Sequence, residues 1–84
     1  MEQFETGMMA RSKNGHDAGK VYVITKVEEA YVYLVDGKVR TLDKPKKKKK
    51  KHVQLIKESF DIQGTTDVDI KRWIKIWNKE DNQN

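Results

Sequence analysis

Two segments in the first half of the chain combine β-branched and aromatic residues with turn-forming residues at their ends. Val21 to Val27 and Ala30 to Val35 have this pattern, which is typical of β-strands, and Glu28-Glu29 fits a tight connection between them. The sequence also predicts a short opening strand from Met8 to Ser12 and a last strand from His52 to Ile56.

Glycine and proline residues mark the ends of these segments. Gly15 and Gly19 lie in a polar stretch and supply the positive φ that a turn requires. Asp36-Gly37 predicts a two-residue type I′ hairpin, after which Lys38 to Leu42 returns as another strand until Pro45 ends the pairing. Five short strands with few apolar residues predict a small closed β-barrel, because closure removes exposed strand edges.

The C-terminal part of the chain has the period of a helix. Ile70, Trp73, Ile74 and Trp77 follow the i, i+3, i+4, i+7 spacing of an amphipathic helix, predicted over residues 66–79. Thr66 lies three residues before Asp69, close to a capping box. Such a short helix is marginal alone in water, so we expect the four apolar residues to dock it on the barrel or on the segment 60–62. The alternative is that they form a protein-interaction face or lie in a membrane surface.

The predicted organisation is a mainly β domain with an appended α-helix. Residues 1–7 are expected to be flexible, 8–56 to form the barrel with a basic loop at 44–52, and 57–65 to connect it to the helix. Residues 80–84 are expected to fray.

Charge is concentrated in one place. Residues 44–51 hold seven of the 18 Lys and Arg residues, and removing those seven charges takes the net charge from +5 to −2. A block this dense repels itself and attracts a polyanion, although it would also fit a solvated loop or, in a eukaryote, a nuclear import signal. Because lysine is a point charge, such a block would grip phosphates without reading bases.

A family resemblance rests on the glycine turn and its flanks. The stretch from Met8 to Gly37, with Gly15-His16-Asp17-Ala18-Gly19-Lys20 between two strand-like segments, resembles a KOW motif, an RNA-binding unit of several ribosomal and transcription-elongation proteins. With the Asp36-Gly37 hairpin, the basic cluster and Lys51-His52-Val53, residues 8–56 resemble small bacterial KOW proteins related to a large-subunit ribosomal protein of archaea and eukaryotes.

The resemblance implies an SH3-like barrel whose loops contact RNA, with ribosomal RNA as the expected partner. The chain departs from the family at His16 and Ala18, where Lys or Arg is common, so more of the phosphate contact would fall to the lysine run. The glycines are expected mainly to form the turn and otherwise to let the backbone approach a phosphate. The candidate RNA-binding residues are Lys13, Gly15, His16, Gly19, Lys20, Lys38, Arg40, Lys44, Lys46, Lys47, Lys48, Lys49, Lys50, Lys51 and His52.

The three tyrosines are expected to pack in the barrel more than to stack on bases. Strand alternation places Tyr31 and Tyr33 on one face and Val32 and Leu34 on the other, but the sequence does not say which face is exposed. Exposed tyrosines beside a basic patch would stack unpaired bases.

Other functions receive little support from the sequence. There is no cysteine, and two histidines without neighbouring ligands do not predict a metal site, so no cofactor is expected. No catalytic constellation or small-molecule site is recognisable, and the chain lacks an apolar run that could span a bilayer. We therefore expect a cytoplasmic, non-catalytic RNA-binding protein without a membrane partner.

Two other functions stay open. The chain is alternatively a protein-interaction adaptor that binds a ribosomal or transcription-factor partner through the barrel or the tryptophan helix. A third possibility is general stickiness towards nucleic acids or membrane surfaces.

Overall fold

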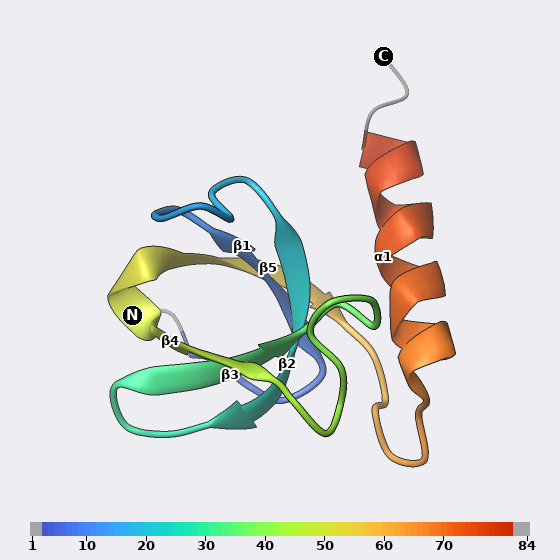
Figure 1. The fold of residues 1–84 in the computed structure, drawn as a ribbon, viewed down its shortest axis with the longest axis horizontal. Helices are drawn as coiled ribbons and strands as arrows, with labels where there is room; N and C mark the ends of the chain where they lie inside the picture. Colours follow the sequence, from blue (N-terminus) through green and yellow to red (C-terminus); the bar gives the residue numbers. More distant parts are fainter. Residues whose placement is uncertain (1–2, 82–84) are drawn as a thin grey trace.

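The computed structural model of the protein describes residues 3–81 and consists of a curled antiparallel sheet with one helix against it (Figure 1). Its elements in chain order are β1 (Met8–Ser12), β2 (Val21–Val27), β3 (Tyr31–Val35), β4 (Lys46–Lys49), a 3-10 turn η1 (Lys50–His52), β5 (Val53–Ser59) and α1 (Asp67–Asp81). Mainly β architecture with a C-terminal helix is therefore confirmed.

The expectation of a closed barrel is wrong. The strands are hydrogen-bonded in the order β4-β3-β2-β1-β5, so β4 and β5 are the two edges of an open sheet within the described part of the chain. The two edges are joined only through η1, which leads from the end of β4 directly into β5. The sheet nevertheless curls strongly (Figure 1). An apolar cluster of side chains fills its concave side.

The prediction of a strand from Lys38 to Leu42 is also wrong. This stretch belongs to a loop between β3 and β4, and the fourth strand is instead Lys46–Lys49, within the predicted basic loop at 44–52. Gly37 has φ +79°, but Asp36 does not have positive φ, so the predicted type I′ turn does not form. Asp36 accepts hydrogen bonds from the backbone N–H groups of Lys38 and Arg40 at 2.8 and 2.9 Å, which curls the chain into a wider loop.

The helix holds this loop in place. The backbone N–H of Leu42 donates to the Asp67 carboxylate at 2.8 Å. Gly37 lies so close to the first turn of α1 that a Cβ atom there would collide with the backbone of Asp67. The loop therefore follows the helix instead of pairing with β3, and a residue with a side chain would not fit at position 37.

Two apolar clusters lie on opposite faces of the sheet. The inner cluster fills the concave side and contains Ala10, Tyr22, Ile24, Val32, Leu34, Val53 and Leu55. The helix-side cluster contains Met9, Val21, Val23, Val35, Ile70 and Ile74. Successive residues of β1, β2 and β3 alternate between the clusters, as the pleat of a strand requires.

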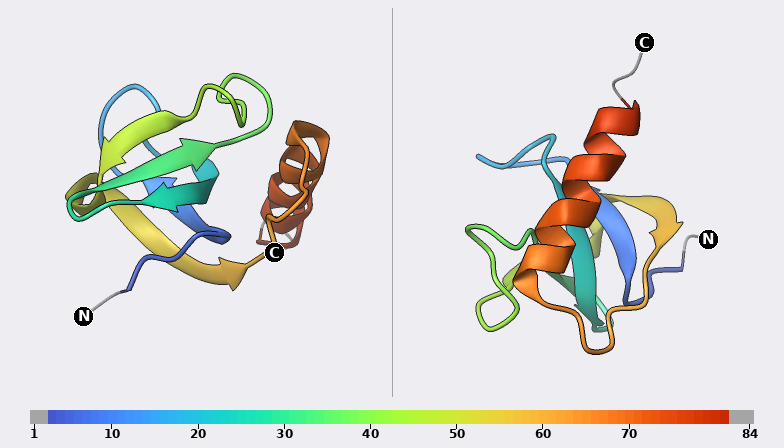
Figure 2. Two further views of the ribbon diagram at one scale, coloured as in Figure 1. Left: turned by 90° about the horizontal axis from the view of Figure 1, so that it is seen from below. Right: turned by 90° about the vertical axis from the view of Figure 1, so that its right-hand side faces the viewer.

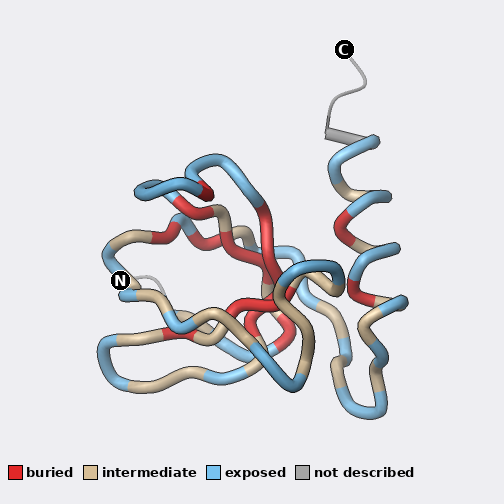
Figure 3. Tube along the Cα trace, in the orientation of Figure 1, coloured by how far each residue is buried: buried red, intermediate tan, exposed pale blue. Residues whose placement is uncertain are grey.

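The helix covers the part of the convex face formed by β1, β2 and the end of β3 (Figure 2), and its buried residues face the strands (Figure 3). Its N-terminus forms the predicted reciprocal cap, in which the Asp69 N–H donates to Thr66 Oγ1 and the Thr66 N–H donates to Asp69 Oδ2, both at 3.3 Å. The helix continues to Asp81, two residues beyond the predicted end at residue 79.

The segment before β1 is attached to the sheet. Phe4 packs against the inner cluster, the Gly7 N–H donates to the Ile24 carbonyl at 2.8 Å, and the Phe60 N–H donates to the Gly7 carbonyl at 2.8 Å. The segment predicted to be flexible, 1–7, therefore includes folded residues, whereas residues 1 and 2 lie outside the described part. Residues 82–84 of the predicted frayed tail also lie outside it.

Within residues 3–81, no helix combines the length and apolar content that crossing a membrane requires.

We predict that Ile70→Ala lowers the free energy of unfolding by about 3 kcal/mol, because Ile70 is fully buried between α1 and the sheet. Ile76→Ala is the matched control on the same helix. Ile76 is 48% exposed, so its truncation should change stability by less than about 1 kcal/mol. Urea unfolding followed by tryptophan fluorescence measures both, and equal losses would show that α1 does not contribute to the core through its sheet-facing side.

Candidate functional site

The lysine run is a strand at the edge of the sheet, with regular alternation of its side chains. Lys48 and Lys46 of β4 lie opposite Val32 and Leu34 of β3, so these two lysines share the concave face with the inner cluster. Tyr31 lies opposite Lys49 and Tyr33 opposite Lys47, on the convex face. The pleat therefore divides the run into two lysines that point inward and two that point outward.

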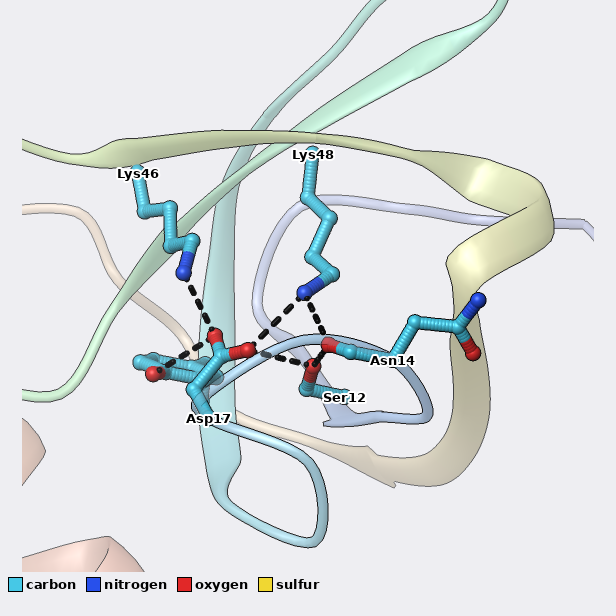
Figure 4. Close-up of polar contacts among 6 residues, drawn as sticks. Ser12, Asn14, Asp17, Lys46 and Lys48 are labelled. Carbon is cyan, nitrogen blue, oxygen red and sulfur yellow. Dashed lines mark hydrogen bonds and ion pairs between the residues drawn. The ribbon is translucent and has the colours of Figure 1, made fainter.

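The inward lysines meet a buried carboxylate, that of Asp17 (Figure 4). Lys46 Nζ donates to Asp17 Oδ2 at 2.8 Å, and Lys48 Nζ donates to Asp17 Oδ1 at 2.9 Å. Ser12 Oγ donates to Asp17 Oδ1 at 2.9 Å, and Tyr22 Oη donates to Asp17 Oδ2 at 3.0 Å. The Asp17 side chain is 8% exposed and that of Lys48 10%, so this is a largely desolvated ion pair. We call these five residues the Asp17 cluster.

Burial alone would raise the pKa of Asp17. The hydrogen bonds from Lys46, Lys48, Ser12 and Tyr22 favour the carboxylate and together outweigh burial, so the pKa lies well below its ordinary value of 3.8. Burial and the nearby Asp17 carboxylate raise the pKa of Tyr22 to about 12. The cluster therefore holds an ionised aspartate and a neutral tyrosine at neutral pH.

The glycine turn lies beside the inward side of β4. Gly15 and Gly19 have φ of +88° and +90°, so they form the turn as predicted. Lys48 Nζ also donates to the Asn14 carbonyl at 2.7 Å, and the Lys13 N–H donates to the His52 carbonyl at 2.8 Å. These contacts join the turn to the middle of the lysine run and to His52, the residue that follows the run. The predicted residues Lys13, His16 and Lys20 are exposed along it.

On the convex face, Lys47 of β4 and Lys26 of β2 lie over tyrosine rings. Lys47 Nζ is 4.4 Å from the ring centroid of Tyr31 and 5.9 Å from that of Tyr33, and Lys26 Nζ is 5.2 Å from the Tyr33 ring. Lys49 is exposed beside them. We call Tyr31, Tyr33, Lys47 and Lys49 the Tyr–Lys face. Glu28 borders it, 3.8 Å from Lys47 Nζ. This face presents cations and partly exposed aromatic rings together.

The remaining candidate residues lie in two places. Lys50, Lys51 and His52 form η1, where Lys51 is exposed and Lys50 lies over the Phe4 ring at 5.6 Å. Lys38, Arg40 and Lys44 lie in the loop that connects β3 to β4, outside the two strands that form the Tyr–Lys face. The structure thus brings together the glycine turn, β4 and η1, but places the loop residues with α1 (Figure 1).

The residues predicted to dock the helix do so. Ile70 and Ile74 are buried in the helix-side cluster, and Trp73 and Trp77 pack against it. Trp73 stacks on Phe60 with ring centroids 4.6 Å apart and an interplanar angle of 5°, and the guanidinium of Arg11 lies 5.4 Å from the Trp77 ring. Docking on both the sheet and the segment 60–62 is confirmed.

Asp17 is the residue that sequence reasoning missed. It sits inside the turn where the KOW resemblance leads one to expect basic residues, and a lone acidic residue opposite a lysine run was the available signal. Residues Tyr31 to Leu34 alternate between the two faces of the sheet. This alternation shows which lysines point towards Asp17 only when the pairing of β3 with β4 is known.

Among residues 3–81, no three histidine or carboxylate side chains are grouped as a metal ion would require. No protein-family model matches the chain, and a search of curated proteins finds no match.

We predict that Asp17→Asn lowers the free energy of unfolding by about 3 kcal/mol, because it leaves two partly buried ammonium groups without their counter-charge. Asp43→Asn is the matched control, since Asp43 is exposed and bonds only to Thr41 Oγ1 among the described contacts. That control should change stability by less than about 0.5 kcal/mol. Chemical denaturation of both variants at neutral pH checks the difference, and similar losses would contradict it.

The stability difference between the wild type and Asp17→Asn is predicted to depend on pH. Because the folded-state pKa of Asp17 is depressed, its contribution to stability is fully present above the ordinary pKa of 3.8 and is lost as pH falls towards the folded-state value. The stability difference between the wild type and Asp17→Asn should therefore be constant from pH 8 to about pH 5 and shrink below it. Urea midpoints measured from pH 8 to pH 2 test this, and a difference independent of pH would contradict it.

Proposed function

We propose that this protein is a non-catalytic RNA-binding module that grips structured RNA with the Tyr–Lys face and η1. The observation that carries the proposal is that β4 fixes Lys47 and Lys49 on the convex face, with Lys47 lying over the ring of Tyr31. Cations held beside aromatic rings offer a phosphate contact and a stacking surface within the length of one nucleotide.

Charge supports a polyanionic partner. Lys46 and Lys48 share the single negative charge of Asp17, and Lys47 lies 3.8 Å from Glu28, whereas Lys44, Lys49 and Lys51 are exposed. The phosphate-binding part of the run is therefore the outward set together with η1, and the inward set positions it. Lysine contacts of this kind are set by the shape and charge of the RNA and not by its sequence.

The architecture is consistent with a small KOW-like domain, and we propose that the curled five-stranded sheet is an open variant of an SH3-like barrel. Lys48 joins the glycine turn to the lysine strand, so the two segments that contact RNA in KOW proteins are close together here. On that resemblance, we propose ribosomal RNA as the target. The alternative of a protein adaptor used either the β domain or the tryptophan helix. The packing of Trp73 and Trp77 on the domain weighs against the second of these two routes and leaves the first open.

We predict that the triple variant Lys47→Gln, Lys49→Gln, Lys51→Gln weakens binding to structured ribosomal RNA fragments at least about tenfold at low salt. Each lost phosphate contact should also reduce the slope of log affinity against log salt by about 0.7 to 0.9, hence by about 2 to 3 in total. Filter binding or fluorescence anisotropy from 50 to 300 mM salt measures both quantities.

The matched control removes three exposed lysines elsewhere, Lys57→Gln, Lys75→Gln and Lys79→Gln, and lowers the net charge by the same amount. This control should retain at least half of the affinity and most of the salt slope. Equal losses in the two triple variants would reduce the interaction to general electrostatic attraction, and no loss in either would contradict RNA binding through this face.

A further inference from the structure

An open hollow of about 490 Å³ lies at one end of the Tyr–Lys face. It is lined by Glu29, Ala30, Tyr31, Lys49, Lys50 and Lys51, from the connection between β2 and β3 and from the junction of β4 with η1. The Lys50 N–H donates to the Ala30 carbonyl at 2.9 Å, so a main-chain hydrogen bond holds the two sides of the hollow together. Its volume is within the range of sites that hold one small ligand, roughly 300 to 1,000 Å³.

The lining combines the two chemical features of a nucleotide site. Tyr31 supplies an aromatic ring, and the ammonium of Lys47 lies 4.4 Å from the centroid of that ring. Three further lysines follow one another along the other side. A base that entered the hollow would stack on the ring in place of the Lys47 ammonium, while the phosphates before and after it would meet the lysines along the other side.

We propose that the hollow binds a single unpaired nucleotide of the RNA, with its base stacked on Tyr31 and its flanking phosphates on Lys49 and Lys51. This inference rests on the proposed RNA-binding function and narrows the substrate class from structured RNA in general to RNA with a bulged or looped-out nucleotide. A base inside an intact duplex cannot reach the ring, because its faces are covered by its neighbours.

Glu29 adds a preference among bases. It is the one acidic residue among the described residues that line the hollow, and it is exposed. A carboxylate accepts hydrogen bonds through two oxygens and donates none. Guanine carries two adjacent N–H donor groups on its Watson–Crick edge, whereas adenine presents a ring-nitrogen acceptor there, so the hollow should favour guanine.

The test uses hairpin RNAs with an identical stem that is fully paired or carries one bulged guanine or adenine. Wild-type protein should bind the bulged-guanine hairpin at least about 5-fold more tightly than the paired one, as stacking of one base predicts. Tyr31→Leu should remove this advantage, and Tyr31→Phe should retain it. Tyr33→Leu is the comparison variant, because Tyr33 belongs to the Tyr–Lys face but does not line the hollow. It should weaken binding to paired and bulged hairpins by the same factor and so retain the advantage of the bulged one.

A spectroscopic readout tests contact with the base directly. The fluorescence of 2-aminopurine placed at the bulge should be quenched by wild type and by Tyr31→Phe, and should not be quenched by Tyr31→Leu. Glu29→Gln should abolish the preference of the protein for the bulged guanine over the bulged adenine. The preference is measured as the ratio of the two affinities, because loss of the negative charge raises the affinity for every hairpin.

The outcomes separate this inference from the function on which it rests. If Tyr31→Leu retains the advantage for the bulged hairpin while the triple lysine variant loses binding, RNA binding stands and the nucleotide site is overturned. If wild type binds paired and bulged hairpins equally, the nucleotide site is likewise overturned. An unchanged guanine preference in Glu29→Gln overturns the role of Glu29. If no hairpin binds at low salt, the proposed function itself fails.

Discussion

The buried carboxylate of Asp17 is the interaction on which the rest of this structure depends. Four consecutive lysines in one strand repel one another, and lysine has a low intrinsic preference for strands. Asp17 offsets that repulsion by accepting hydrogen bonds from two of the four, and Ser12 and Tyr22 bond to the same carboxylate. Its desolvation is compensated by charge and geometry, which is the condition under which a buried ion pair can persist.

Fixing the inward lysines also fixes the outward ones. Successive side chains of a strand point to opposite faces of the sheet. The contacts that hold Lys46 and Lys48 on the concave face therefore also hold Lys47 and Lys49 on the convex face. A flexible loop of the same composition would lose conformational entropy on binding a polyanion, and this strand has already lost much of it on folding. The lysine run is therefore a preorganised surface and not a solvated loop.

The features of the fold that the sequence predicts are those set by residues close together in the chain, and the features it does not predict are set by residues far apart. The bounds of β1 and β2, the glycine turn and the cap at Thr66 depend on neighbouring residues, and the sequence predicts them correctly. Strand β4 depends on Asp17, 29 residues from Lys46. The loop before it depends on Asp67, 25 residues from Leu42. Local propensity favoured a hairpin and a basic loop at these positions, and tertiary contacts overrode it.

The register of β3 against β4 links the core to the surface. Val32 and Leu34 are fully buried in the inner cluster, and their burial determines which lysines share that face. A slip of one residue would bring Lys47 and Lys49 inward, where one carboxylate would face the wrong pair, and would place Lys46 and Lys48 over the tyrosines. The apolar side chains of β3 and the carboxylate of Asp17 therefore select the same register by independent means. Because both must be satisfied at once, the position of the Tyr–Lys face is determined by the core of the domain.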